Sequence, residues 1–249
     1  MVERISTGIK GLDELIEKGF EKGSLVEVAG SEGTFKSTFA LHFAVEGIRN
    51  KEKVTYISLE EPKESFEQSA KNNGVEKEFS KVDFKNIDIN DVIENMKTYT
   101  NSSEGAEGLA KKILKGIDTP DRLIFDTATT LALYSARTQL KIKGNNDIAF
   151  VRPTAGDIRI MLYYLANELR KKKSTTVLFL AESGEGEMYL PEEVLKYICD
   201  AKLELKKSNL GTGSPRTIVI HKMRHTKHPL DEMTLNLTDK GLEVVKLTE

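Results

Sequence analysis

The sequence has no tryptophan, one cysteine and no apolar run near the roughly 20 residues that a membrane-spanning helix needs. The single cysteine, Cys199, excludes an internal disulfide and suits a reducing compartment. The first residues, MVERISTGIKG, contain no apolar segment of the kind found in secretory signals. We therefore expect a cytoplasmic protein that has no disulfide and does not enter a membrane.

A large excess of charge of either sign is also absent. The 37 Lys and Arg nearly balance the 39 Asp and Glu, so the net charge of −2 gives no overall attraction to nucleic acid. Any such binding would need a local basic patch. With 249 residues, of which 39% are hydrophobic, the chain is long enough to bury a substantial core. We expect residues 1–249 to form one α/β domain.

Apolar segments rich in β-branched residues alternate with segments of helical periodicity. Such near-continuous apolar strands are typical of a parallel sheet that helices cover on both faces. Strands are expected at 25–30, 54–61, 82–88, 122–127 and 175–182, and helices at 37–49 and 157–173. After residue 200, short alternating segments at 201–207, 216–224, 234–239 and 241–247 predict an antiparallel extension of the sheet. Two polar connections, 97–110 and 134–156, are expected to be mobile.

The segment GSEGTFKST, residues 30–38, joins the first of these strands to the first helix. A phosphate-binding loop has a glycine, four variable residues and then Gly-Lys-Ser/Thr. Gly30, Lys36 and Ser37 match this pattern, whereas Phe35 replaces the second glycine. In such a loop, successive backbone N–H groups surround phosphate oxygens at a helix N-terminus. The alternative is a glycine-rich turn with Lys36 in solvent, but the order of strand, loop and helix favours phosphate binding.

Phe35 decides whether this loop still holds a nucleotide. A Cβ and a ring crowd an anion that approaches the backbone closely, whereas glycine does not. However, phenylalanine keeps its backbone N–H, and helical dihedral angles at residue 35 would turn the ring away from phosphate. The ring would then pack on the neighbouring strand or on the base, and Gly33 remains available for a positive φ. We expect nucleotide binding to persist in a weakened form.

Five segments, taken in order, resemble the KaiC/RadA-like branch of the RecA-type ATPases, and they span nearly the whole chain. They are ISTGIKGLDELI, GSEGTFKST, YISLEEP, LIFDTATTL and HKMRHTKH with LTDKG. The sequence departs from the family pattern at Phe35, at His225 and at residues 17–23, EKGFEKG, where the family has Gly-Gly-x-Pro. The resemblance implies a RecA-like P-loop NTPase fold, a mostly parallel twisted sheet with helices on both faces and a C-terminal antiparallel β extension.

The resemblance also implies that ATP and Mg²⁺ bind at the loop. Lys36 would contact the β- and γ-phosphates, and Ser37 would bind Mg²⁺ together with Asp126, which ends the apolar strand LIFD. Glu182, which ends LFLAE, would sense the γ-phosphate. The rest of the loop would contribute Ser31, Glu32, Gly33, Thr34, Phe35 and Thr38. The alternative role for Asp126 is that of a helix N-cap.

Glu60 and Glu61 close the second expected strand beside the loop, and they resemble the family's water-activating glutamates. A carboxylate at this place orients and partly deprotonates the water that attacks the γ-phosphate. Glu60 is interpreted as the base and Glu61 as its partner. The alternative is a pair of solvent-facing acids, because EEPKESF is also a good helix N-terminus.

Lys222 and Arg224 alternate along an expected strand and so project to one face. The resemblance implies that both cations act on the ATP of a neighbouring subunit, where they would stabilise transition-state charge. Thr226, His228 and Thr238 resemble residues that contact the neighbour's base and ribose, and Met223 belongs to the same C-terminal motifs. A homo-oligomer follows, in the form of a hexameric ring. The alternative is a basic, solvated hairpin.

In RecA-like rings, the loops after the fourth and fifth of these strands face the central pore. The first loop here carries Tyr134, Arg137, Lys141, Lys143, Phe150 and Arg152, a set able to follow single-stranded DNA. The second, SGEGEMYLPEE, is acidic and argues against DNA, so a protein-binding insertion is the alternative. Three functions are compatible with the sequence: a slow ATPase that acts as an oligomeric regulator or switch, a non-catalytic nucleotide sensor, and a DNA-binding accessory that resembles recombinase paralogues.

Overall fold

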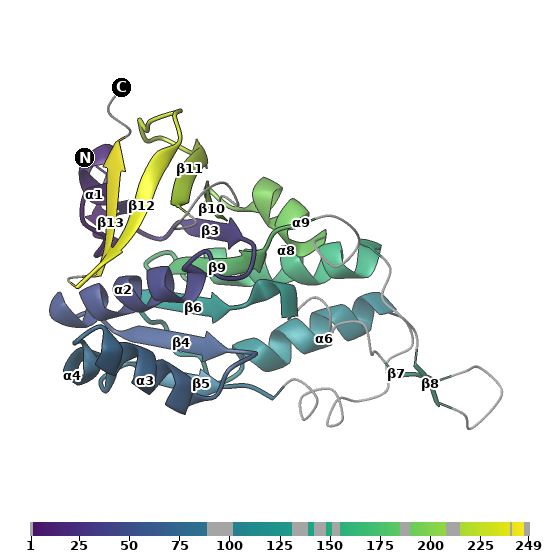
Figure 1. The fold of residues 1–249 in the computed structure, drawn as a ribbon. Coiled ribbons are helices and arrows are strands. Elements are labelled where there is room, and N and C mark those ends of the chain that lie inside the picture. Colours follow the sequence, from purple (N-terminus) through teal and green to yellow (C-terminus); the bar gives the residue numbers. More distant parts are fainter. Residues whose placement is uncertain are drawn as a thin grey trace.

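The computed structural model describes residues 2–88, 102–130, 139–141, 148–150, 155–184, 190–207, 215–239 and 241–246. Its centre is a nine-stranded sheet in the order β13-β12-β11-β10-β3-β9-β6-β4-β5 (Figure 1). The parallel strands are β3 (Leu25–Gly30), β4 (Val54–Ser58), β5 (Asp83–Asn86), β6 (Arg122–Asp126), β9 (Thr176–Glu182) and β10 (Ala201–Lys207). Every residue of β3, β4 and β6 is buried, as a sheet covered on both faces requires. The predicted parallel sheet is confirmed.

The C-terminal strands extend this sheet in the antiparallel direction, as predicted. They are β11 (Arg216–Met223), β12 (Met233–Thr238) and β13 (Gly241–Lys246), each paired with the strand before it. β10 belongs to both parts, because it is parallel to β3 and antiparallel to β11. Two small sheets are separate, β1 (Arg4–Ile5) with β2 (Phe20–Glu21) and β7 (Gln139–Lys141) with β8 (Ile148–Phe150), and the second lies away from the main sheet in Figure 1.

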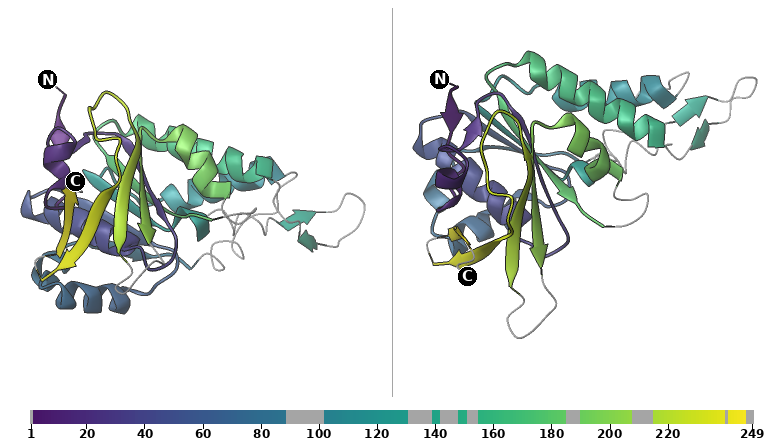
Figure 2. Two further views of the ribbon diagram at one scale, coloured as in Figure 1. Left: turned by 45° about the horizontal axis from the view of Figure 1, so that its top comes forward. Right: turned by 90° about the horizontal axis from the view of Figure 1, so that it is seen from above.

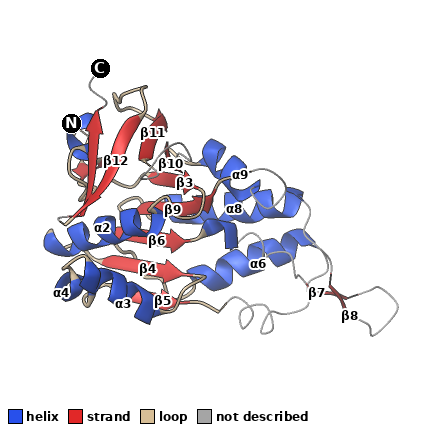
Figure 3. Cartoon of the chain, in the orientation of Figure 1, coloured by secondary structure: helices blue, strands red, loops and turns tan. Residues whose placement is uncertain are grey.

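Helices cover both faces of the sheet, and each layer of helices closes one hydrophobic core. One layer contains α1 (Leu12–Leu15), α2 (Lys36–Arg49), α3 (Lys63–Asn72) and α4 (Glu76–Phe79). The other contains α6 (Ser102–Leu114), α8 (Ala155–Lys171) and α9 (Leu190–Ile198). The view from above in Figure 2 separates the purple-to-blue layer from the teal-to-green layer, and Figure 3 shows helices on either side of the strands. No helix among the described residues is long and apolar enough to cross a membrane.

The two predicted helices follow their sequence patterns. α2 is buried nearly all round, with both Phe39 and Phe43 fully enclosed. In α8, the buried residues Met161, Leu165 and Leu169 belong to the apolar face that the periodicity predicted. Burial on these faces, more than intrinsic helix propensity, accounts for the stability of both helices.

The two segments expected to be mobile are partly regular. Residues 102–110 begin α6, which packs Ala110 and Ile113 into the core beside α8. This apolar stripe outweighs the serines and glycines that dominate the start of the helix. Within 134–156, β7 and β8 form a hairpin and α8 begins at Ala155, while the other residues of that segment lie outside the described chain.

β4 ends earlier than predicted, at Ser58. The Ser58 hydroxyl donates to the Glu61 carbonyl oxygen at 2.6 Å and accepts from the Glu61 N–H at 3.1 Å. A serine side chain that bonds to nearby backbone in this way replaces sheet hydrogen bonds with a turn. Glu60 and Glu61 therefore lie in a turn after the strand and do not form its last residues.

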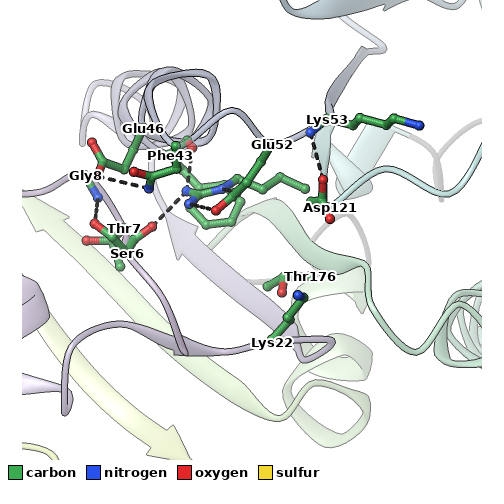
Figure 4. A network of polar contacts seen from close by, with 12 residues as sticks. Ser6, Thr7, Gly8, Lys22, Phe43, Glu46, Glu52, Lys53, Asp121 and Thr176 are labelled. Carbon is green, nitrogen blue, oxygen red and sulfur yellow. Dashed lines mark hydrogen bonds and ion pairs between the residues drawn. The ribbon is translucent and has the colours of Figure 1, made fainter. Parts of the chain in front are cut away.

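A buried arginine joins the N-terminal segment, α2 and β6. Arg122, the first residue of β6, is fully buried and forms an ion pair with Glu52. Its Nη1 donates to the carbonyl oxygens of Ser6 and Phe43, at 2.8 Å each, in the network drawn in Figure 4. Its guanidinium also lies 4.5 Å from the centroid of the Phe43 ring. β6 and α2, which both carry site residues, are thereby held together.

Candidate nucleotide-binding site

The loop between β3 and α2 is sharply bent. Gly33 and Phe35 both have left-handed backbone conformations, with φ of 75° at each. Thr34 Oγ1 donates to the Ser31 carbonyl oxygen at 2.8 Å and closes the bend. Phe35 therefore does not have the helical dihedral angles that would turn its ring away from phosphate, and instead has a backbone conformation that glycine favours. That conformation costs a residue with a Cβ about 1–2 kcal/mol.

The Phe35 ring packs against an arginine of β11. Arg216 Cζ lies 4.0 Å from the ring centroid, and Arg216 Nε donates to the Gly33 carbonyl oxygen at 2.8 Å. The ring is partly buried and also contacts the core on the α2 side of the sheet. The ring therefore packs on a side chain of β11, which is separated from β3 by β10, and its packing on a nucleotide base stays a prediction.

Lys36, the first residue of α2, is buried rather than solvated. Its side chain is 7% exposed, and its Nζ lies 2.7 Å from Glu182 Oε1 at the end of β9. The same Nζ donates to the Ser31 carbonyl oxygen at 3.0 Å. The alternative of a solvated lysine in a plain turn is therefore wrong, and the loop, α2 and β9 meet at one cation.

Asp126 ends β6 and is buried beside the start of α2. Its Oδ2 accepts a hydrogen bond from the Tyr56 hydroxyl at 2.6 Å, and the Ser37 side chain lies beside the same carboxylate. Burial raises the pKa of Asp126 to about 6, although the hydroxyls of Tyr56 and Ser37 both act to lower it. The sequence reasoning placed Ser37 and Asp126 together but missed Tyr56, whose only signal was its place in the segment YISLEEP.

Glu60 is held by two threonines that follow Asp126. Its Oε1 accepts from Thr127 Oγ1 at 2.7 Å and from Thr130 Oγ1. The sequence reasoning missed both threonines, although they lie in the quoted segment LIFDTATTL. Within the described part of the chain, no hydrogen bond or ion pair fixes the Glu61 side chain. Both glutamates are exposed, but they differ because two hydrogen bonds position the Glu60 carboxylate.

These side chains line one cleft of about 490 Å³, here called the loop cleft. Its lining is Glu32, Gly33, Thr34, Phe35, Lys36, Ser37, Thr38, Glu60, Glu61, Asp126, Thr127 and Glu182. The cleft lies at the carboxyl ends of β3, β4, β6 and β9, where open α/β sheets bind ligands. A buried cation, the N-terminus of α2 and a serine hydroxyl beside a carboxylate suit a triphosphate with Mg²⁺. The residues present therefore fit ATP and its metal ion.

Lys222 and Arg224 lie at the far end of β11 from the loop cleft. Arg216 reaches the loop from the first position of β11, and Lys222 follows six residues later, about 20 Å along a strand. Lys222 Nζ donates to the Cys199 carbonyl oxygen at 2.6 Å, and Arg224 Nη1 lies 3.2 Å from Asp200 Oδ1. Both cations thus contact residues between α9 and β10, although Arg224 follows the end of β11, and neither extends into its own chain's loop cleft.

Three other residues of the C-terminal motifs are engaged within the chain. Thr226 Oγ1 accepts from Arg4 Nη1 at 2.6 Å, and Thr238 Oγ1 donates to the Gly241 carbonyl oxygen at 2.9 Å. Met223 packs its side chain into the core. A nucleotide of another subunit would therefore meet the main chain of Met223 and hydroxyls that already have partners.

His228 lines a second hollow, of about 740 Å³, between α1 and the connection from β11 to β12. Its other lining residues are Glu14, Leu15, Glu17, Lys227, Pro229, Asp231, Glu232, Met233 and Lys246. Although this hollow is larger than the loop cleft, its lining includes neither the bent loop and buried Lys36 nor the N-terminus of α2, which are the features that suit phosphate. We therefore place the phosphates in the loop cleft.

The predicted DNA-binding segment lies mostly outside the described residues. Tyr134, Arg137, Lys143 and Arg152 lie outside the described residues. Lys141 and Phe150 belong to β7 and β8, of which the backbone is described. The acidic segment 183–193 is likewise described only at its ends.

Comparison with known proteins agrees with this fold. A UPF0273 protein of Thermotoga maritima is 23% identical, over 98% of this chain and 96% of its own length. Circadian clock protein KaiC3 of Synechocystis is 25% identical over 99% of this chain, which spans 46% of that longer protein. The crystal structure of a KaiC-like protein from Pyrococcus horikoshii has the same fold, with a TM-score of 0.70 and 23% identity over 98% of this chain and 99% of that one.

The family described as "ATPase: KaiC" has a model that matches residues 5–143 and 147–249. The matched ranges contain the loop, both glutamates, Asp126 and the C-terminal motifs. Because the match covers far more than half of the sequence, this chain belongs to the KaiC family of ATPases.

Proposed function

We propose that this chain binds ATP with Mg²⁺ in the loop cleft and hydrolyses it slowly, as a homo-oligomeric regulator or switch. Membership of the KaiC family supports a nucleotide-binding ATPase. The observation that carries the proposal is the meeting of Lys36, Asp126 and Glu60 in one cleft beside the bent loop. Each of them has the chemistry that one part of phosphoryl transfer needs.

Lys36 and the loop backbone would bind the phosphates. The N–H groups at the start of α2 favour an anion, because a helix N-terminus carries partial positive charge. Lys36 is paired with Glu182 in the structure, so a phosphate at Lys36 would compete with that carboxylate. The competition supports the proposed role of Glu182 as a sensor of the γ-phosphate, because its partner changes when the nucleotide binds.

Ser37 and Asp126 would hold the metal ion, since Mg²⁺ prefers hydroxyl and carboxylate oxygens. Ser37 and Asp126 lie side by side in the loop cleft, and Tyr56 fixes Asp126 Oδ2. When bound, Mg²⁺ would neutralise charge on the phosphate oxygens.

Glu60 would orient the attacking water. The two threonine hydroxyls hold its Oε1, and no described residue bonds to its Oε2, which leaves that oxygen for a water molecule. A carboxylate held in this way accepts the proton as the water attacks. The cleft geometry therefore favours Glu60 over Glu61 as the base.

A neighbouring subunit would complete the site. Lys222 and Arg224 lie about 20 Å along β11 from the loop of their own chain, which makes another chain's nucleotide their natural target. Members of the family are typically oligomeric, which supports a ring and, as the finer proposal, a hexamer. In this proposal, residues 1–249 are a single cytoplasmic ATPase domain.

A nucleotide sensor without turnover is the second candidate function. It is favoured by the left-handed Phe35, which introduces strain next to Lys36. The hypothesis of a DNA-binding accessory depends on residues outside the described chain and remains a prediction from the sequence.

Calorimetry with ATP and Mg²⁺ tests nucleotide binding. We expect the wild type to bind ATP and Lys36→Ala to lose at least about tenfold in affinity, because a buried cation at the phosphates is removed. Lys10→Ala, which removes an exposed lysine paired with Glu243, is the matched control and should bind like the wild type. Absence of binding by the wild type would overturn the proposal. Light scattering of the same samples measures the oligomer.

The protonation of Asp126 should make Mg²⁺-dependent binding sensitive to pH. The pKa of Asp126 is raised to about 6, so the carboxyl loses its proton as the pH rises through this value. Only the ionised form is a good Mg²⁺ ligand. We therefore expect the gain in ATP affinity on adding Mg²⁺ to fall as the pH drops below about 6.

Tyr56→Phe should move this pH dependence to higher pH. The Tyr56 hydroxyl stabilises the ionised carboxylate, so its loss raises the pKa of Asp126 further. Titration of ATP with and without Mg²⁺ across the neutral and mildly acidic range measures the midpoint. Asp126→Asn, which cannot titrate, should remove the part of the dependence that comes from this carboxyl and leave the part that comes from the ATP phosphates. A Tyr56→Phe midpoint at or below that of the wild type would contradict this account.

A further inference from the structure

Arg216 contacts the phosphate-binding loop at two places. Its Nε donates to the Gly33 carbonyl oxygen at 2.8 Å, and its guanidinium carbon lies 4.0 Å from the centroid of the Phe35 ring. Arg216 begins β11 and pairs with Lys207 at the end of β10, so it reaches the loop from a hydrogen-bonded strand. An element of the sheet therefore braces the loop from outside.

The hydrogen bond to Gly33 fixes the direction of the next N–H group. A trans peptide unit is planar, and its C=O and N–H point in opposite directions. Since Arg216 holds the Gly33 carbonyl toward β11, the N–H of Thr34 points to the other side of the loop. Thr34 lines the loop cleft, and its N–H belongs to the series that would surround the phosphates.

The stack on Phe35 stabilises a backbone conformation that this residue disfavours. Phe35 has φ of 75°, and a Cβ opposes that conformation. A guanidinium within about 6 Å of an aromatic centroid attracts the ring. The ring meets Arg216 while the backbone holds this conformation, so the contact favours the bend. A glycine at position 35 would need no such support.

We propose that Arg216 is a positioning residue for nucleotide binding, which holds the loop's N–H groups in place and compensates for phenylalanine at the glycine position. The inference rests on the proposed function, because its ligand is the same ATP. Arg216 acts here through Gly33 and Phe35, and its role requires no direct contact with phosphate.

A double-mutant cycle tests the inference by calorimetry with ATP and Mg²⁺. Arg216→Ala should raise the Kd about tenfold, because the loop loses both contacts. In a Phe35→Gly background, Arg216→Ala should raise the Kd about threefold or less, because glycine adopts the bend without support. Arg216→Lys keeps the charge but loses the planar stack, so this variant should also bind ATP weakly. The melting temperatures of the ligand-free variants should stay close to that of the wild type.

Several results would overturn the inference. Wild-type affinity in Arg216→Ala would show that the brace is unnecessary, and wild-type affinity in Arg216→Lys would show that charge alone matters. If Arg216→Ala lowers the ATP affinity equally in both backgrounds, Arg216 does not act through Phe35. Arg49→Ala removes an exposed arginine of α2 and is the matched control, so a loss equal to that of Arg216→Ala would indicate a general charge effect.

The inference and the proposed function fail in different ways. If the wild type binds ATP and Lys36→Ala does not, while Arg216→Ala binds normally, only the inference is wrong. If the wild type itself does not bind ATP, the proposed function is wrong and the inference falls with it.

Discussion

A Glu60→Gln variant is expected to bind ATP about as tightly as the wild type and to release phosphate at least about 100-fold more slowly. The substitution keeps the size of the side chain and its carbonyl oxygen, so Thr127 and Thr130 can still donate to it. It removes the negative charge that would accept a proton from the attacking water. Binding depends on Lys36 and the loop backbone, which this change does not touch.

The neighbouring glutamate provides an internal comparison. Glu61 lies in the same turn, but the Ser58 hydroxyl bonds to its backbone and leaves its carboxylate unconstrained. We therefore expect Glu61→Gln to slow phosphate release by about tenfold or less, as suits a supporting charge. Glu64→Gln, an exposed acid in the first turn of α3, is the surface control and should be unchanged.

Single-turnover hydrolysis, with the protein in excess over ATP and total phosphate measured after quenching, gives the cleanest measurement, because it separates hydrolysis from product release. If Glu60→Gln releases phosphate at the wild-type rate, Glu60 is not the base. If Glu61→Gln shows the larger loss, the roles of the two glutamates are reversed. If the wild type binds ATP but releases no phosphate, the nucleotide sensor is the better description.

The strand, loop and helix around Lys36 could be predicted because each is specified by adjacent residues. A short apolar strand, a glycine-containing turn and an apolar helix follow one another directly, and each pattern is local. The acid that ends an apolar strand, Asp126, was found in the same way. Parallel strands bring their carboxyl ends to one edge of the sheet, so these separate signals converge in space.

The supporting contacts could not be predicted, because they join residues that are far apart in the sequence. Arg216 and Gly33 are 183 positions apart, and Tyr56 and Asp126 are 70 positions apart. The left-handed conformation of Phe35 could not be predicted for a related reason. Residue type disfavours that conformation, and the contact that opposes this preference comes from a distant strand that places a guanidinium over the ring.

Replacing Arg122 with methionine is expected to lower the free energy of unfolding by about 3–5 kcal/mol. Methionine has a similar length and fills much of the space, so the main loss is electrostatic. The change leaves Glu52 without its partner and the carbonyl oxygens of Ser6 and Phe43 without their donor. Buried acceptors without donors account for most of such penalties.

The packing around Arg122 leaves no room for an easy repair. A Cβ at Gly47 would lie 2.7 Å from Arg122 Cδ and 2.7 Å from a methyl carbon of Val54, so α2 approaches β6 closely only because that residue is glycine. The guanidinium fills a space that α2 and the strands define jointly. A smaller or differently shaped side chain would leave a cavity there as well as unpaired acceptors.

Urea unfolding of Arg122→Met, Glu52→Gln and the double variant measures the coupling between the two side chains. Glu52 is partly exposed, so Glu52→Gln should cost less than Arg122→Met, and the double variant should cost less than the sum of the two. Arg170→Met, at a partly exposed arginine that pairs with Asp200, is a matched control and should cost about 1 kcal/mol or less. Additive losses of unfolding free energy, or equal losses at the two arginines, would contradict the network.

The loss of Arg122 should also weaken ATP binding at temperatures well below unfolding. Arg122 holds α2 and β6 together, and Lys36 and Asp126 lie on these two elements.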